Sequence, residues 1–554
     1  MKFDYLLGRP KSLLVFLMSD YPSIQTFLEL QEKLIHLSSS EELFDIVQFI
    51  NRENIFQEFE SSIELIFSIR SIFNANLLSK DYLRELLIQL TDQLAYFFKN
   101  NPGIWNLFDF KIDKYFILQL LELNNDFIKL PKTIKDGRKY FSPEIGFNFH
   151  NMKNKEFQTP DEFFVNRKNG ENLNELSQAI RKDDMNLFTH LISQTSLKIN
   201  ASSIPPALFE RFSFIQTDVS LVEYAAFFSS IQIFKYLILN DAQFNNELTK
   251  YAIAGGNNEI IHICEDKSLS FKKSINIAIQ QWKNELVEYL LQEYSFNEES
   301  FTIALKSYNY QIVKKIIDET DESQISNLIQ KTIIHGHLSI LNYLISLGFI
   351  NKIKDELFLM IINHKIKMFE ETLYTLEDLD FINDINPKYN MRLVDYSLNK
   401  DIRCFEILCS FEQVDMNEKL ETQEDAPILK IAKAGRFDLF ELLASDENID
   451  INLENKFGET VLHIACQKGN IDAVKMIVSL DCIMIDRKTN DGKTPLHYAV
   501  EANNIEIVKF LVNECGAEKS YKDNKGVDVY ISTNSMRYCK TFLSYGNCSI
   551  FIST

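Results

Sequence analysis

Two short histidine motifs carry residue types that could do chemistry at close spacing. His335 and His337 flank Gly336 and could be two ligands of a metal ion, because imidazole nitrogens bind zinc. No cysteine or acidic residue adjoins them, and an inter-helix turn explains the pair without a metal. His262 and Cys264 could form a catalytic pair, but residues two apart on a helix do not share a face. We expect a structural role for both motifs.

Four acidic residues, Glu377, Asp378, Asp380 and Asp384, lie close together in the chain. They lack the glycine and the terminal glutamate of a calcium-binding loop, so a solvated loop explains them. The sequence has neither the G-x-x-x-x-G-K-[ST] nor the G-x-G-x-x-G pattern that cradles nucleotide phosphates. The sequence therefore predicts a protein that is not an enzyme, with no catalytic residues, no cofactor and no metal ion.

An apolar signature that recurs about eleven times indicates which elements hold these side chains. Each copy has two apolar residues followed one helical turn later by two more, as in Ile507-Val508 and Leu511-Val512. Two copies are imperfect, because Thr372 and Glu265 stand at positions that are apolar in the pattern. Successive copies are 26 to 36 residues apart, except for a first step of 46, and such periods indicate a stacked repeat array. The copies begin at Leu187, Ile233, Ile260, Leu286, Ile312, Ile340, Met368, Cys404, Leu439, Ala473 and Ile507.

Each copy predicts one helix with a single buried face, because its four apolar positions share one stripe at 3.6 residues per turn. Roughly ten residues upstream of most copies lies a second apolar segment with a small residue, which lets two antiparallel helices approach closely. Such pairs bury their apolar faces only by stacking. The repeat unit is therefore helix, tight turn, helix. The small residues include Ala225, Ala252, Ala278, Ala304 and Ala465.

The last repeats indicate which class of repeat the chain contains. Residues 492–499 read Gly-Lys-Thr-Pro-Leu-His-Tyr-Ala, and residues 458–465 repeat this pattern with Val461 in place of proline. The motif resembles the ankyrin repeat, whose signature is Thr-Pro-Leu-His-x-Ala after a glycine turn. We expect a left-handed turn at Gly492, a helix cap at Thr494, a first helical residue at Pro495 and a hydrogen bond from His497 to the neighbouring turn. Gly469 and Asn503 mark the turns between the two helices of these repeats.

The resemblance divides the chain into three parts. Residues 421–554 are expected to be orthodox ankyrin repeats with short hairpin fingers and a C-terminal cap, whose last helix holds residues 538–543. Residues 170–420 are expected to be shortened, degenerate ankyrin-like repeats, with a surface loop around residues 202–206. The pattern looks like the divergent ankyrin proteins expanded in protists such as trichomonads. The fold class is therefore all-α, an ankyrin-type α-solenoid of eleven to twelve helix pairs.

Residues 1–165 show helical periodicity without the repeat signature and are expected to form an all-α N-terminal domain that caps the array. Four helices are predicted around residues 43–50, 63–69, 83–90 and 115–121, with Ser40 and Asp81 as caps. The apolar run at residues 13–18 is too short for a signal peptide and is expected to be the first helix. The segment from Pro131 to Asn169 is rich in Pro, Gly, Asn and Lys and is expected to be an irregular linker.

Composition limits the partners and the compartment. The net charge of −20 and a pI of about 5.0 disfavour nonspecific binding to nucleic acids or anionic membranes. No run reaches the roughly 18 apolar residues of a membrane helix. The eight cysteines form no C-x-x-C pair, which is typical of reduced thiols in the cytoplasm or the nucleus. Buried helical positions are expected for Cys404, Cys409, Cys466 and Cys539.

The resemblance implies a non-catalytic scaffold that binds a protein partner on the concave and finger surface of the solenoid. Phe457 stands at a fingertip where an exposed ring could anchor a partner, or it packs on the neighbouring finger. One alternative is that the N-terminal domain carries an activity of its own, for example as a substrate adaptor of a ubiquitin ligase. Another is that the chain tethers the cytoskeleton or a membrane protein. The sequence determines neither the partner nor the oligomeric state. The expected binding residues are Lys456, Phe457, Gln467, Lys468, Asn490, Asp491, Glu501, Ala502, Asn524 and Lys525.

Overall fold

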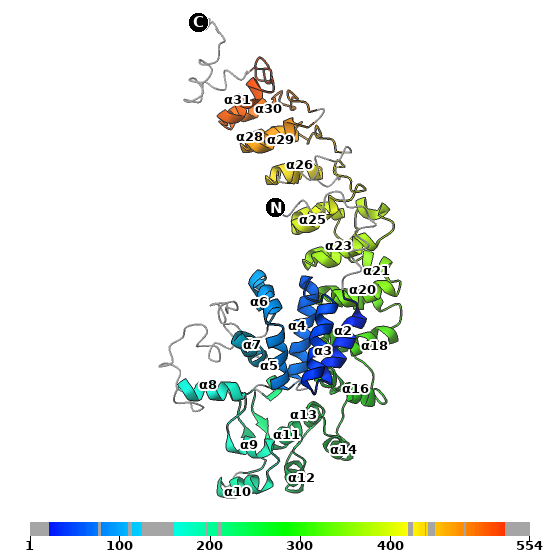
Figure 1. Cartoon of the computed structure of the whole chain (residues 1–554). Helices are drawn as coiled ribbons and strands as arrows, with labels where there is room; N and C mark the ends of the chain where they lie inside the picture. The colour runs from blue at the N-terminus through cyan, green and yellow to red at the C-terminus, as the bar shows by residue number, and fades with distance from the viewer. Residues whose placement is uncertain are drawn as a thin grey trace. The chain divides into compact units, whose positions relative to one another are not determined.

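Figure 1 shows the computed structural model of the chain, in which helices follow one another almost without strands. The described residues divide into two compact units, which meet in sequence between Lys352 and Ile353. The predicted helices at residues 13–18 and 538–543, Cys539 and most of the predicted linker lie outside the described residues. The structure describes residues 22–75, 79–108, 113–123, 160–195, 198–200, 202–207, 210, 212–215, 217–418, 425–437, 439–440, 449–480 and 483–526.

The first unit begins with a group of helices that lacks the repeat pattern. All four helices predicted for this region are present. Their caps lie earlier than predicted: the side chain of Ser39, in place of Ser40, accepts the amide of Glu42, and Ser79, in place of Asp81, caps the third predicted helix. The helices are α2 (Ile24–Ile35), α3 (Ser40–Arg52), α4 (Phe59–Asn74), α5 (Lys80–Gln89), α6 (Thr91–Asn100), η1 (Pro102–Leu107), α7 (Lys114–Leu123) and α8 (Pro160–Asn169).

Helix α8 corrects part of the linker prediction, because residues 160–169 are helical. Proline at the first helical position costs nothing, since its missing N–H would be unpaired there in any case. The mixed polar and apolar residues of this segment gave no helical periodicity in the sequence.

Six helix pairs follow in the same unit, as the repeat signature predicts. The first helices of neighbouring pairs pack on one another, as α11 does on α13 and α15 on α17. Ala225, Ala252, Ala278 and Ala304 are fully buried at these contacts, which confirms the role of the small residues. The pairs are α9 (Glu175–Arg181) and α10 (Met185–Thr195), α11 (Leu221–Phe227) and α12 (Ile231–Leu239), α13 (Leu248–Gly255) and α14 (Asn258–Asp266), α15 (Ile275–Gln280) and α16 (Asn284–Leu290), α17 (Ser300–Lys306) and α18 (Tyr310–Glu319), and α19 (Ile325–His335) and α20 (Leu338–Ser346).

The long step before α11 holds a small sheet where the sequence suggested only a surface loop. Strand β1 (Ser203–Ile204) pairs antiparallel with β2 (Val219–Ser220), and η3 (Ser213–Ile215) lies between them. Ser203 is exposed, but Ile204 is buried against the repeat. The described residues from α12 to α20 contain no strand, as the shorter steps of 26 to 28 residues predict.

The N-terminal helices do not simply cap the array, because α2 and α4 pack against its later pairs. Helix α2 contacts α18 and α20, and α4 contacts α20. The side-chain amide of Gln31 donates to the carbonyl of Tyr308 at 2.8 Å, and Glu64 accepts the amide of Ser339 at 3.2 Å. The ring of Phe67 stacks on Tyr308 with centroids 5.5 Å apart. Residues more than 240 positions apart in sequence thus form one buried interface.

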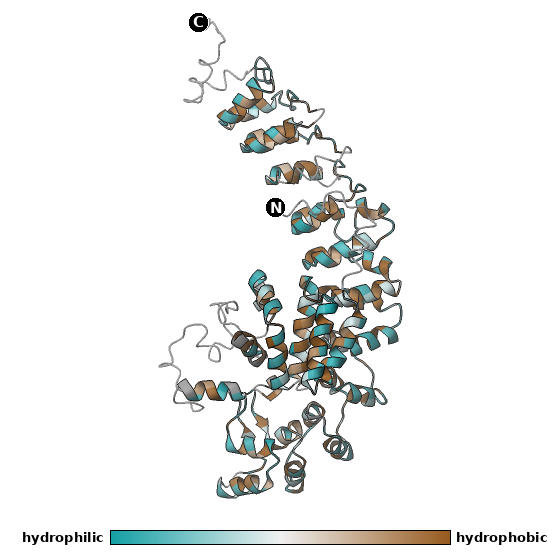
Figure 2. Ribbon diagram, in the orientation of Figure 1, coloured by the Kyte–Doolittle hydropathy of each residue, from teal (hydrophilic) through white to brown (hydrophobic). Residues whose placement is uncertain are grey.

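The second unit continues with helix pairs of the same kind. Figure 2 shows that its helices carry both hydrophobic and hydrophilic residues, as amphipathic helices of a stack require. A signature residue, Leu439, lies in a helix of which only residues 439 and 440 are described. Helix α21 (Ile350–Lys354) spans the boundary between the units in sequence. The described helices that follow are α22 (Leu357–Ile362) and α23 (Ile366–Thr375), η4 (Asp380–Asn383), α24 (Leu393–Lys400) and α25 (Ile402–Leu408), α26 (Pro427–Ala434), α28 (Val461–Lys468) and α29 (Ile471–Val478), and α30 (Pro495–Glu501) and α31 (Ile505–Asn513).

Candidate protein-binding surface

The fingers before α28 and α30 are tight turns closed by their own backbones. In the first, the amide of Asn455 donates to the carbonyl of Glu459 at 3.0 Å, and the Asn455 side chain accepts the amide of Phe457 at 2.9 Å. Gly458 and Gly492 take positive φ angles of 78°, which confirms the expected left-handed turn and the reason for glycine there. Each finger therefore holds its tip in a defined conformation.

Neighbouring fingertips are joined by asparagine side chains. Asn490 donates its backbone amide to the carbonyl of Phe457 at 2.9 Å and its side-chain amide to the carbonyl of Lys456 at 2.8 Å. One repeat later, Asn524 makes the same two bonds to Asp491 and Asn490. These asparagines were predicted as binding residues, yet their side chains hold the stack together. Their contribution to a binding surface is thus to fix the spacing of the tips.

All ten residues predicted to bind a partner lie at exposed positions, and nine of them, all except Ala502, have side chains that can make polar or aromatic contacts. Phe457 has 52% of its surface exposed, so the neighbouring finger covers only part of the ring. The ammonium of Lys456 lies 5.0 Å from the centroid of that ring. We name these nine residues the finger face; they are Lys456, Phe457, Gln467, Lys468, Asn490, Asp491, Glu501, Asn524 and Lys525. Whether this face binds anything stays a prediction.

Three polar residues at the inner side of the fingers were not predicted. The hydroxyl of Tyr498 donates to Glu459 of the preceding finger at 2.7 Å, and Lys493 pairs with Glu501 at 2.6 Å. Burial and the Glu459 carboxylate both raise the pKa of the Tyr498 hydroxyl, so it remains a donor. Tyr498 occupies the variable position of the Thr-Pro-Leu-His-x-Ala motif, so the motif gave no signal for it. The ion pair with Lys493 orients Glu501 on α30.

The histidines of the motif serve the fold. Nδ1 of His463 accepts the amide of Thr460 at 3.1 Å, and its Nε2 donates to the carbonyl of Lys493 at 3.2 Å, which links one repeat to the next. The pair of Thr494 and His497 repeats the first of these bonds at the same distance. The hydrogen bond to the neighbouring turn is thus seen at His463, while Thr494 is the N-cap residue of α30, as predicted, with its hydroxyl 2.9 Å from Nδ1 of His497.

The other histidine motifs have structural partners as well. His337 is buried, its Nδ1 is 2.9 Å from the hydroxyl of Tyr310, and Gly336 forms the turn between α19 and α20. His262 is exposed and bonds Glu265, while Cys264 is buried on another face of the same helix. In the part of the chain that the structure describes, no three His, Cys, Asp or Glu residues come together in a way that could hold a metal ion.

The described cysteines are free thiols in helical surroundings. Cys404 and Cys466 are buried as expected, whereas Cys409 is only half-buried because it ends its helix. Burial raises the pKa of all three thiols, which keeps them protonated. No helix among the described segments has the length and apolar content needed to cross a bilayer.

The comparisons with known proteins agree with this geometry. The family model of ankyrin repeats, which comprises three copies, matches residues 393–481 and 428–523, and a domain of unknown function, DUF3447, matches residues 239–314. No curated protein matches the sequence.

Two solved structures share shorter stretches. The crystal structure of the ankyrin repeat protein EF0377 is 26% identical, covers 35% of this chain and 98% of its own, and has a TM-score of 0.31. An ankyrin repeat domain from Acinetobacter baumannii AYE is 19% identical, covers 33% of this chain and 91% of its own, and has a TM-score of 0.29. By the family match, residues 393–523 are similar to ankyrin repeats, and the left-handed turns at Gly435, Gly458, Gly469 and Gly492 agree with that similarity.

Proposed function

We propose that the finger face binds a protein partner and that this binding, without catalysis, is the function of the chain. Ankyrin repeats generally mediate protein–protein interaction, and residues 393–523 are similar to such repeats. Stacked repeats present surface residues that have no role in the core, and these determine the partner. That the nine residues of the finger face form the binding site is our own inference.

The exposed ring of Phe457 is the observation that carries the proposal. Its backbone is held from both sides, by the side chain of Asn455 and by the amide of Asn490. A large apolar side chain on a fixed backbone loses little conformational entropy when a partner covers it. Aromatic residues of this kind dominate the binding energy of many interfaces. A partner that encloses the ring should therefore depend on it strongly.

Affinity purification of the full chain with quantitative mass spectrometry tests the proposal. Phe457→Ala should deplete a partner that the unchanged chain recovers, because loss of an interface anchor costs about 2 kcal/mol or more. Met484→Ala is the matched control, since Met484 is 49% exposed and does not lie at a fingertip. Equal recovery with Phe457→Ala and with a second variant, Lys525→Glu, would contradict the finger face as the site.

The ubiquitin-ligase adaptor stays a prediction, since nothing among the described residues favours it. The tight packing of α2 and α4 on α18 and α20 changes how it must be tested. An isolated N-terminal fragment would expose Phe67, Glu64 and Gln31, which the array covers in the full chain. Capture of a ligase subunit should therefore be sought with the full chain.

A further inference from the structure

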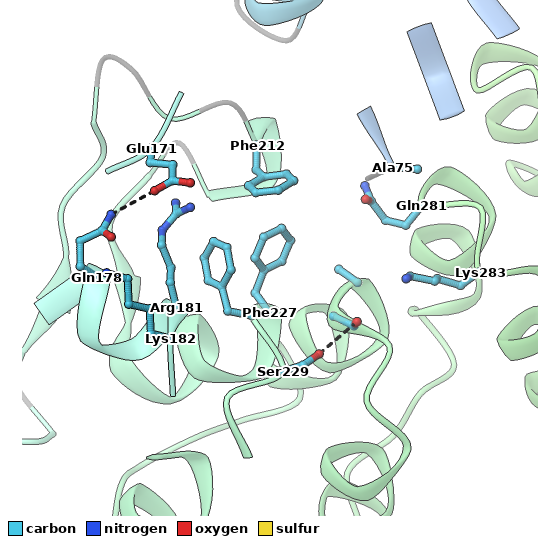
Figure 3. A pocket seen from close by; sticks show the side chains of 13 residues that line it. Ala75, Glu171, Gln178, Arg181, Lys182, Phe212, Phe227, Ser229, Gln281 and Lys283 are labelled. Carbon is cyan, nitrogen blue, oxygen red and sulfur yellow. Dashed lines mark hydrogen bonds between the residues drawn. The ribbon is translucent and has the colours of Figure 1, made fainter. Parts of the chain in front are cut away.

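A cavity of about 370 Å³ lies in the unit that ends at Lys352, at the C-terminal ends of α9, α11, α13 and α15 (Figure 3). The end of α4 contributes Ala75 to the wall. Its polar lining is rich in cationic and amide groups, with Arg181 and Lys182 at the end of α9 and Gln281 and Lys283 after α15. A cationic cavity is unexpected in a chain of net charge −20.

Lys283 stands where the neighbouring repeats carry a helix cap. Asn257 and Asn309 occupy this N-cap position before α14 and α18, and each accepts a backbone amide with its side chain. Before α16 the position is Lys283, whose side chain makes no capping bond. An ammonium cannot accept a hydrogen bond, and a positive charge at a helix N-terminus is unfavourable. Lys283 therefore stabilises the start of α16 less than an asparagine would at the same position.

The side chain of Lys283 lies instead over the turn of the preceding repeat. A Cβ atom at Gly256 would be only 3.2 Å from its Cε and Nζ atoms, so glycine leaves room for it. The ammonium has no hydrogen-bond or ion-pair partner among the residues that the structure describes, and burial lowers its pKa. A desolvated cation without a partner is costly unless an anion approaches it.

The cavity is what distinguishes Lys283 from other lysines at the N-cap. Lys365 takes the same place before α23, so the position alone identifies no ligand site. The acidic residue of the lining, Glu171, lies with Gln178 and Arg181 on the opposite side of Figure 3 from Lys283. Arg181 already forms an ion pair with Glu210, so its charge is neutralised within the protein.

Aromatic rings form another wall of the cavity. Phe212 and Phe227 have centroids 5.4 Å apart and lie, in Figure 3, between the Arg181 side and the Lys283 side. Both rings are only partly buried and present an apolar surface to the cavity. The amide of Gln281 lies on the Lys283 side and can donate a hydrogen bond. A cation, an amide and two rings thus surround one space.

We propose that this cavity binds a small ligand that joins an anionic group to a planar ring, with the anion on Lys283 and the ring against Phe212 and Phe227. A charge-assisted hydrogen bond from the ammonium would compensate its partly buried charge, and Gln281 would add a second donor. The volume admits a molecule of the size of a mononucleotide or an aromatic acid.

Isothermal titration calorimetry of the full chain with adenosine monophosphate, adenosine and inorganic phosphate tests the proposal. The monophosphate carries both features, and each of the other probes carries one. We expect the monophosphate to bind more tightly than adenosine or phosphate. Lys283→Met should weaken its binding by about tenfold to a hundredfold, as expected for a lost charged hydrogen bond. Lys306→Met is the matched control, because Lys306 ends the first helix of the next pair and is exposed.

A second readout does not depend on the stability of a variant. Competitive amine labelling of the unchanged chain, followed by mass spectrometry, measures the reactivity of Lys283 directly. The monophosphate should protect Lys283 and leave Lys306 reactive. Absence of binding by both phosphate-bearing probes in the millimolar range, or unchanged affinity in Lys283→Met, would overturn the proposal. Labelling of Lys283 that the monophosphate leaves unaltered would overturn it as well.

Discussion

The buried imidazole of His463 should make the stability of its repeat depend on pH. Nδ1 accepts the amide of Thr460, while Nε2 donates to the carbonyl of Lys493. Only the neutral imidazole with its proton on Nε2 can make both bonds. Burial lowers the pKa of His463 from its ordinary value of 6.5 to about 4. The folded repeat therefore keeps this side chain neutral well below the pH at which the unfolded chain protonates it.

The sign and the size of the effect follow from this difference. Between pH 6.5 and about 4 the unfolded state binds the proton and the folded state does not. Stability is therefore fully present above the unfolded pKa and is lost as the pH falls toward the folded one. The two pKa values correspond to a loss of about 3 kcal/mol in the free energy of unfolding, since each pKa unit is worth about 1.4 kcal/mol.

Hydrogen exchange with mass spectrometry can follow this change in the full chain. The opening free energy of the α28 amides should fall by about 1.4 kcal/mol per pH unit below pH 6.5, after correction for intrinsic exchange. His463→Asn removes the titrating group but keeps an acceptor near Thr460, so its slope should be shallower even though its stability at neutral pH is lower. Equal slopes in both proteins would refute the reasoning.

Three further substitutions should act through contacts that the structure defines. Arg392→Met should destabilise its repeat by about 1 to 3 kcal/mol, measured as faster limited proteolysis, because the buried Asp395 carboxylate loses the guanidinium 2.9 Å away and keeps Lys430 as its cation. Thr494→Ala should cost about 1 kcal/mol in the opening free energy of the α30 amides, because the N-cap residue loses the hydrogen bond from its hydroxyl to Nδ1 of His497. Gly458→Ala should cost about 1 kcal/mol or more in thermal stability, because its φ is positive and the new Cβ would lie 2.8 Å from the amide nitrogen of Asn490.

Matched changes separate these effects from general damage. Arg403→Met removes an exposed guanidinium that also pairs with an aspartate, and its proteolysis rate should stay close to that of the unchanged chain. Gly516→Ala tests the φ cost alone, because a Cβ there meets no atom within 4 Å. Equal losses in Gly458→Ala and Gly516→Ala would show that the contact with Asn490 contributes nothing.

Much of the fold could be predicted from short stretches of sequence. The spacing of apolar pairs located the second helix of each repeat, and the alanines upstream located the first. Gly336, Gly469 and Asn503 take the left-handed conformation at the predicted turns. These features depend on residues close together in the chain, and local periodicity and turn chemistry are enough to specify them. The turn and the helix start formed by the Thr-Pro-Leu-His motif were predictable for the same reason.

The exposed finger face could be placed from the repeat pattern, but the roles of its residues could not. The pattern puts Asn490 and Phe457 alike at fingertips, and only the packed structure shows that the first bonds its neighbour while the second leaves its ring half in solvent. The bond from Tyr498 to Glu459 was missed for a similar reason. Such roles depend on the distance between adjacent repeats, which no single repeat encodes.

The sequence by itself determined a series of helix pairs and the resemblance of residues 393–523 to ankyrin repeats, because each pair is specified by its own periodic residues. The tertiary structure alone decided that α2 and α4 pack on α18 and α20, and that Gln31 meets the backbone of Tyr308. It also decided that Lys283 turns into a cavity instead of capping α16. Contacts of this kind join surfaces from distant parts of the chain, and they depend on shape and on the desolvation of polar groups, which leave no periodic mark in the sequence.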